Sequence, residues 1–253
     1  MRVLILGGTG DARELAARVA NITEIQAIAS LSGATREPVT PVGNVRVGGF
    51  GGVAGLVNYL REMQIDVLID ATHPFANQIS ENATKAAQEV GISRLLLNRP
   101  PWEKLPGDNW LEVNNNIDAA ATLENQNQRV FLTIGRQEIS TFAHLQNIWF
   151  LMRMIDPPKA DSIIPNGLIL YDKGPFNLEK ERDILIQYSI DTIVSKNSGG
   201  NATYSKIIAA RELGIKVVMV KRPPVPEGEQ VADVEGAVKW LREKLKVMNL
   251  EDV

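Results

Sequence analysis

Val3-Leu4-Ile5-Leu6-Gly7-Gly8-Thr9-Gly10-Asp11-Ala12-Arg13-Glu14-Leu15 decides the fold, because a short apolar run leads through three glycines into a sequence with helical spacing. Glycines allow a sharp turn and a close approach of backbone to an anion, and the following helix points its free N–H groups at that anion. The stretch predicts a phosphate-binding strand, turn and helix, with Gly7, Gly8, Thr9, Gly10 and Arg13 contacting a nucleotide. Arg13 replaces the third glycine of the full fingerprint, so a tight turn without a ligand is the alternative.

The second predicted strand ends at Ser30, twenty residues after Gly10, where a fold that reads a ribose 2′-hydroxyl usually places an acidic residue. No acid stands there. Ser30, Ser32 and Arg36 instead offer hydroxyl groups and a guanidinium, which suit a 2′-phosphate better than a free diol. The sequence therefore favours NADPH, with NADH possible. A polar surface loop without a ligand is the competing interpretation.

Composition excludes several classes of function. The 253 residues include no cysteine and only two histidines, His73 and His144, so disulfides, thiolate metal sites and multi-histidine metal centres are not expected. The net charge of −3 argues against general nucleic-acid binding, and no apolar run is long enough to span a membrane. We expect a cytoplasmic protein, a monomer or a weak homo-oligomer, without a metal.

Short β-rich runs alternate with helical ones along the chain, which is typical of parallel sheets. Ten strands are predicted, at 2–6, 25–30, 44–47, 66–70, 94–97, 129–134, 148–153, 168–172, 191–195 and 216–220. Eight helices are predicted, at 11–20, 53–63, 76–90, 116–125, 136–143, 177–188, 203–213 and 234–247. Three prolines interrupt this alternation between Asn98 and Asp108. The sequence thus predicts an α/β protein with two Rossmann-like domains, 1–98 for a dinucleotide and 99–253 for a substrate, each a mainly parallel sheet flanked by helices. The active site is expected in the cleft between them.

Loops after the third and fourth strands carry further candidate residues, because ligands of parallel sheets bind beyond the carboxyl ends of the strands. Four glycines stand within Gly48-Gly49-Phe50-Gly51-Gly52, which predicts contact of Gly49, Phe50 and Gly51 with the cofactor. The second loop contains Thr72 and His73 before Pro74, and it is expected to face the nicotinamide. His73 could donate the proton of a reduction, or it could be a structural residue bonded to backbone.

The second half carries basic residues after four of its predicted strands, at Gly135-Arg136, Arg153, Lys173 and Lys196-Asn197-Ser198-Gly199-Gly200. In a chain with more acids than bases, this grouping favours an anionic substrate. Candidate substrate contacts are Arg136, Lys173, Lys196, Ser198, Gly199 and Gly200. The alternative is that these cations pair with neighbouring acids such as Asp156 and Asp172.

Five segments together resemble the precorrin-6A and cobalt-precorrin-6A reductase family of cobalamin biosynthesis: 7–13, 30–33, 47–52, 70–76 with its sequence Asp-Ala-Thr-His-Pro-Phe-Ala, and 195–200. The resemblance implies two Rossmann-like domains and transfer of a hydride from a reduced nicotinamide nucleotide to one double bond of a tetrapyrrole macrocycle with many carboxylates. One departure is that Ala34-Thr35 stand before Arg36, where the family often has an arginine directly after the Ser-Leu-x-Gly segment.

The residues leave two rival functions to consider. A short-chain dehydrogenase requires a Tyr-x-x-x-Lys pair, and none of the four tyrosines has a lysine four residues later. A redox-sensing regulator could bind NADP through a similar first half without turnover. Such a protein would need no anion-binding second domain.

Overall fold

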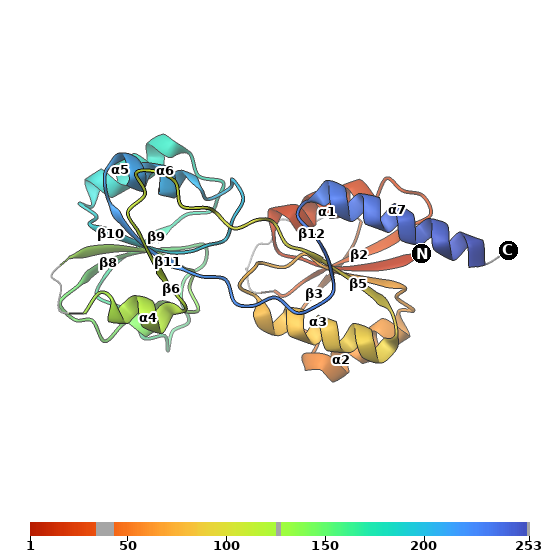
Figure 1. Ribbon diagram of the computed structural model, residues 1–253. Coiled ribbons are helices and arrows are strands. Elements are labelled where there is room, and N and C mark those ends of the chain that lie inside the picture. The colour runs from red at the N-terminus through yellow and green to blue at the C-terminus, as the bar shows by residue number, and fades with distance from the viewer. Residues whose placement is uncertain (34–42, 125–127, 252–253) are drawn as a thin grey trace. The chain divides into compact units, whose positions relative to one another are not determined.

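The computed structural model describes residues 1–33, 43–124 and 128–251. The chain forms two compact units, one made of Met1–Pro100 with Pro224–Val253 and the other of Pro101–Pro223 (Figure 1). Each unit holds a six-stranded sheet in which every strand pairing of the described residues is parallel. The predicted fold class, two Rossmann-like α/β domains, is confirmed.

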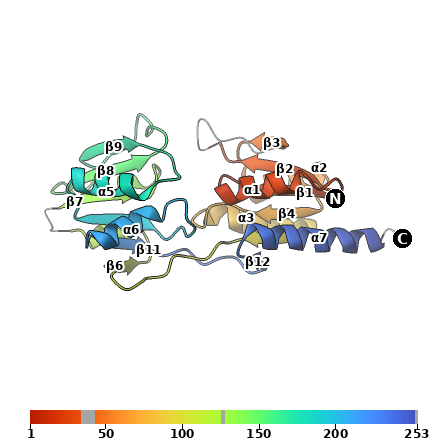
Figure 2. The ribbon, with the colours of Figure 1, turned by 90° about the horizontal axis from the view of Figure 1, so that it is seen from above.

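The first sheet has the strand order β3-β2-β1-β4-β5-β12. Figure 2 shows β3, β2, β1 and β4 in this order. Its strands are β1 (Arg2–Leu6), β2 (Gln26–Leu31), β3 (Asn44–Val47), β4 (Val67–Asp70), β5 (Ser93–Leu97) and β12 (Glu229–Val231). This is the order of dinucleotide-binding folds, in which the chain reverses direction across the sheet between the first and fourth strands. The carboxyl ends of β1 and β4 therefore frame the expected ligand crevice.

Helices cover both faces of this sheet. One face carries α1 (Gly10–Val19) and α7 (Val234–Glu251), and the other carries α2 (Gly52–Glu62) and α3 (Asn77–Val90). Strand β1 serves both faces, since Val3 and Ile5 pack in the α1 core whereas Leu4 and Leu6 pack in the α2 core. A strand buried on both sides is apolar throughout, which explains the run before the glycines.

The second sheet repeats the arrangement with the order β9-β8-β7-β10-β11-β6. Its strands are β6 (Trp110–Val113), β7 (Arg129–Thr133), β8 (Trp149–Met154), β9 (Gly167–Tyr171), β10 (Thr192–Lys196) and β11 (Lys216–Val220). The flanking helices are α4 (Asn116–Ala121), the 3₁₀ turn η1 (Ile139–Phe142), α5 (Leu178–Gln187) and α6 (Ser205–Glu212). Its reversal of order lies between β7 and β10, which places residues 134–136 and 197–200 at the corresponding edge.

The C-terminal boundary differs from the predicted one. Residues 224–253 belong to the first unit, so the expected second domain, 99–253, is wrong at its C-terminal end. Strand β12 pairs with β5, Glu229 standing opposite Leu95, and Trp240 and Leu241 of α7 complete the core against α1. The physical reason is that the first sheet would otherwise leave β5 as an open edge and one apolar face of α1 uncovered.

The ten predicted strands are all present within one residue at either end, and seven of the eight predicted helices are found. The helix predicted at 116–125 ends at Ala121, and residue 125 lies outside the described residues. Residues 136–143 contain only the four-residue 3₁₀ turn Ile139–Phe142. The two short edge strands β6 and β12 were not predicted.

Candidate functional site

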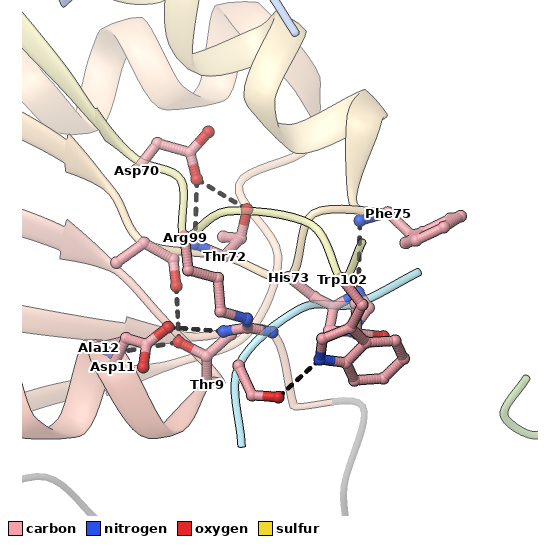
Figure 3. Close-up of polar contacts among 12 residues, drawn as sticks. Thr9, Asp11, Ala12, Asp70, Thr72, His73, Phe75, Arg99 and Trp102 are labelled. Carbon is pink, nitrogen blue, oxygen red and sulfur yellow. Dashed lines mark hydrogen bonds and ion pairs between the residues drawn. The ribbon is translucent and has the colours of Figure 1, made fainter. Parts of the chain in front are cut away.

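The glycine turn after β1 is fixed on three sides. The Gly7 N–H donates to the Ser30 carbonyl at 2.9 Å, which ties the turn to β2. Thr9 caps α1, because its hydroxyl oxygen accepts from the Ala12 N–H at 3.0 Å and its O–H donates to the Ala71 carbonyl at 2.8 Å (Figure 3). The N-terminus of α1 is therefore held at the point where the strand order reverses, with the geometry that binds phosphate in nucleotide folds.

An arginine that sequence reasoning missed lies beside this helix start. Nη1 of Arg99, which follows β5, contacts Oδ2 of Asp11 in the first turn of α1 at 2.5 Å (Figure 3). The ion pair neutralises a carboxylate that would otherwise repel an anion at the helix N-terminus. The two residues stand 88 positions apart, and so no local pattern indicated the pair.

Asp70 at the end of β4 holds the next loop. This carboxylate is completely buried, and its Oδ1 accepts from both the N–H and the hydroxyl of Thr72, at 3.1 and 2.7 Å (Figure 3). Its Oδ2 is also buried and has no hydrogen-bond partner among the described residues. Burial lowers the pKa of the nearby Arg94 guanidinium, and the charge of Asp70 opposes that shift. Asp70 therefore positions Thr72 and the residue that follows it.

His73 is exposed at the tip of this loop. Its Nδ1 accepts from the Phe75 N–H at 3.3 Å, and the two rings lie 5.8 Å apart between centroids. Because Nδ1 acts as acceptor, the proton of the neutral imidazole resides on Nε2. A shallow pocket enclosing about 330 Å³, open solvent included, adjoins the ring, and its lining residues are Thr72, His73, Pro74, Asn77, Ser80, Leu96, Leu97, Asn98, Pro224, Val225 and Pro226. The side chain predicted to donate a proton thus borders a pocket at the ends of β4 and β5.

The carboxyl ends of β2 and β3 form the other half of this edge. Ser30 is buried and Ser32 is exposed, whereas Arg36 lies outside the described residues. Gly49, Phe50 and Gly51 precede α2, and Gly51 caps that helix at a positive φ of 80° that favours glycine. Sequence reasoning missed Arg46, whose guanidinium contacts both the Ser30 hydroxyl and this glycine turn.

In the second unit, Arg136 follows β7 and Lys196 is the last residue of the neighbouring strand β10, one residue inside the strand where the sequence placed it just after. Nζ of Lys196 lies 2.7 Å from Oε1 of Glu138, and Nη1 of Arg136 donates to the Pro157 carbonyl at 2.9 Å. Glu138 also accepts from the Asn116 amide. The lysine is thus already engaged by a carboxylate of the chain itself.

The turn after Lys196 is tightly held. Gly199 and Gly200 have positive φ values of 65° and 70°. The Trp102 indole N–H donates to the Gly200 carbonyl at 2.7 Å, and Arg222 donates to the Ser198 carbonyl at 2.9 Å. Positive φ at two consecutive positions explains why this turn carries two glycines.

Arg153 does not lie on an exposed rim, contrary to the expectation from its position after a strand. It is buried in β8, and its Nη2 lies 2.7 Å from Oε1 of the fully buried Glu181. Lys173 is exposed after β9, the edge strand two places from β7. Only Arg136 and Lys196 of the four predicted cations therefore lie next to the reversal of strand order.

Within the described residues, no group of three or more histidine, cysteine or acidic side chains could hold a metal ion, and no helix has the length and apolarity needed to cross a membrane. Two doubly wound units, one with a capped glycine turn at its reversal point, define a two-domain Rossmann-like protein of the nucleotide-binding class.

Comparisons with known proteins identify the family. The model of the precorrin-6x reductase CbiJ/CobK family matches residues 2–242, and the chain belongs to this family of cobalamin-pathway oxidoreductases. A Rhodococcus erythropolis protein named precorrin-6A reductase is 48% identical over 241 residues, which cover 95% of this chain and 97% of that relative. A Priestia megaterium protein named cobalt-precorrin-6A reductase is 28% identical, with 94% and 97% covered. A solved structure described as CobK precorrin-6A reductase superposes with a TM-score of 0.90 at 39% identity, covering 96% of both chains.

The predicted family and fold are thus confirmed. The roles of the individual site residues stay predictions, as does an active site between the two domains.

Proposed function

We propose that this chain reduces precorrin-6A with NADPH. The observation that carries the proposal is that proteins named precorrin-6A reductase match this chain over nearly its whole length, and that a glycine turn with a capped helix start lies at the reversal point of the first sheet. Bound NADPH supplies the hydride, and the chain positions the two reactants and provides a proton.

Residues of the first unit fit a nicotinamide dinucleotide. The capped start of α1 suits the pyrophosphate, because Gly8 leaves no side chain over the turn and an added Cβ would meet nothing within 4 Å. In this fold the adenosine lies toward β2 and β3 and the nicotinamide toward β4 and β5. That orientation would bring the nicotinamide to the pocket beside His73. The imidazolium form of His73 would then donate its Nε2 proton to the macrocycle as the hydride arrives, and the side chain would return to neutral imidazole.

Similarity favours a substrate without cobalt. The five relatives named precorrin-6A reductase are 39% to 48% identical to this chain, whereas the three named cobalt-precorrin-6A reductase are 28% to 31% identical. A metal-free macrocycle is therefore the proposed substrate.

We assign the substrate carboxylates to the second unit, at Arg136, Lys196 and the turn Ser198-Gly199-Gly200, with Lys173 further along the edge. A substrate carboxylate would replace Glu138 on Lys196, exchanging one charge-assisted contact for another.

Replacement of Lys196 by alanine tests this assignment. The variant should raise the apparent KM for the macrocycle about tenfold, and high salt should reduce the difference because it screens the same attraction. Its affinity for NADPH should not change. Lys221→Ala is the matched control, since Lys221 is an exposed lysine paired with Glu112. A loss of NADPH affinity with an unchanged KM for the macrocycle would place Lys196 at the cofactor instead.

An anaerobic assay with metal-free and cobalt-loaded macrocycle tests the proposed function itself. NADPH should be oxidised with the metal-free substrate at the higher kcat/KM. Preference for the cobalt form would overturn the choice of substrate, and NADPH binding without oxidation by either would favour the regulatory alternative.

A further inference from the structure

Arg46 occupies the position from which a Rossmann-like sheet reads the adenosine ribose. It stands opposite Ser30 in the parallel register of β2 and β3, two residues before the first glycine of the turn. Ser30 is the residue that replaces the usual ribose-binding acid at the end of β2. A cation at this place faces the part of the cofactor where NADPH and NADH differ.

Hydrogen bonds and ring contacts fix the guanidinium in place. Its Nη1 donates to the Ser30 hydroxyl at 3.3 Å and to the Gly48 carbonyl, and its Nη2 donates to the Gly49 carbonyl at 2.7 Å. Its carbon atom Cζ lies 3.8 Å from the centroid of the Phe50 ring, over which it stacks. A guanidinium held on one edge and one face is already oriented for its remaining edge to bind a ligand.

The charge of Arg46 is not balanced by the part of the chain that the structure describes. All three of its hydrogen-bond acceptors there are neutral oxygens, and no described carboxylate forms an ion pair with it. Three of its five N–H groups are used by these contacts, which leaves the Nε–H and one Nη2–H. These two N–H groups form the fork that arginine presents to a phosphate.

We propose that Arg46 binds the 2′-phosphate of NADPH through this fork, with the Ser30 hydroxyl beside it, and so determines the preference for NADPH over NADH. The inference deepens the proposed function and rests on it. The sequence suggested Arg36 as the main contact of the 2′-phosphate. The inference assigns that contact to Arg46, which lies in strand β3.

The experiment measures the affinities of Arg46→Met, Arg46→Lys and the wild type for NADPH and NADH, with adenosine 2′,5′-bisphosphate and AMP as fragments that isolate the 2′-phosphate. Arg61→Met is the matched control, because Arg61 is an exposed arginine of α2 paired with Glu89. Arg36→Met tests the competing arginine.

Arg46→Met should weaken NADPH and adenosine 2′,5′-bisphosphate about tenfold or more, while NADH and AMP change less than about twofold. Arg46→Lys keeps the charge but loses the fork, so its affinity for NADPH should lie between those of the wild type and Arg46→Met. The lysine variant decides the question if the methionine variant does not fold. Equal losses for NADPH and NADH would mean that Arg46 only holds the glycine turn. Loss of the preference in Arg36→Met alone, or a wild type that binds both cofactors equally, would also overturn the inference.

The same titrations separate this inference from the proposed function. A wild type that prefers NADPH through Arg46 but reduces no macrocycle would contradict the reductase proposal and leave the assignment of Arg46 standing.

Discussion

Gly8 is the one glycine of the first turn whose backbone resists a side chain. Its φ is 114°, a conformation that residues other than glycine rarely adopt. Gly10 is the first residue of α1, and its φ is not positive. A Cβ added there would come no nearer than 3.7 Å to the Arg13 side chain, an ordinary contact. The turn therefore requires glycine at Gly8 because of its φ and at Gly7 because an added Cβ would lie 3.2 Å from the Ala12 Cβ, whereas Gly10 would accept a side chain.

Gly8→Ala and Gly10→Ala therefore form a matched pair. Gly8→Ala should weaken NADPH about tenfold and lower the free energy of unfolding by about 1–3 kcal/mol, because alanine is strained at that φ. Gly10→Ala should change NADPH affinity less than about threefold. Cofactor titration and urea unfolding check both variants. Equal behaviour of the two would show that backbone strain at Gly8 plays no special part in binding.

His73→Ala should lower kcat about 100-fold or more, as expected for loss of a proton donor. The dissociation constant of NADPH should change little, because the imidazole is placed to act on the macrocycle. His73→Gln, which restores a donor without acid strength, should not recover the rate. A drop in kcat of less than about fivefold would assign the proton to solvent or to the substrate.

The sequence predicted some residues of the candidate site and missed others. Thr9 and Thr72 stand in loops that follow strand ends and contain glycine or proline, which are local signals in the sequence. Their roles as cofactor contacts stay predictions. Arg46, Arg99 and Asp70 were not assigned roles. Arg46 reaches Ser30 through the register of β2 and β3, and Arg99 reaches Asp11 across 88 positions, so these contacts leave no mark in the neighbouring sequence. Asp70 differs, because its partner Thr72 stands only two residues later.

At the scale of elements, β8, α5 and α6 share a buried charged cluster. Arg153 of β8 pairs with Glu181 of α5, and Lys206 of α6 is buried beside them. Burial lowers the pKa of Lys206 from 10.5 to about 7, with Glu181 opposing the shift and Arg153 adding to it. A strand pattern cannot distinguish a buried, paired arginine from an exposed one, which is why the sequence placed Arg153 on the rim.

Lys206→Met should stabilise the protein at pH 7 more than at pH 10. The unfolded chain binds a proton on Lys206 up to a pKa near 10.5, whereas the folded protein releases it near 7. The free energy of unfolding of the wild type therefore rises as the pH increases from about 7 to about 10.5. A methionine at this position does not titrate, so the variant lacks this rise. Urea unfolding of variant and wild type across this range checks the prediction. A difference in unfolding free energy that stays constant with pH would contradict it.

Helices and strands were predictable from the sequence where their hydrophobic pattern extends over several residues. Strands buried on both faces stand out as continuous apolar runs, and β1 is the clearest case. Strand β12, Glu229-Gln230-Val231, has three residues and is defined only by its pairing with β5. Short edge strands of this kind carry too little pattern for a sequence to reveal.

At the scale of the whole molecule, the first sheet takes its sixth strand from outside the main run of its unit. Strand β12 returns to the first sheet after the second sheet is complete, whereas β6 is the first strand of the continuous second unit. Both crossings contain adjacent prolines, Pro100-Pro101 and Pro223-Pro224. Only the first interruption was interpreted as a junction, because the return of the chain depends on pairing across more than a hundred residues.

The central claim is that the chain transfers a hydride from NADPH to the macrocycle. The most direct test is an anaerobic turnover with NADPH that carries deuterium at both C4 positions, followed by mass spectrometry of the product. We expect the macrocycle to gain two hydrogens, one of them deuterium from the cofactor and the other from solvent. Reduced product without deuterium would contradict direct transfer, and unreduced macrocycle in the presence of bound NADPH would contradict the reductase function.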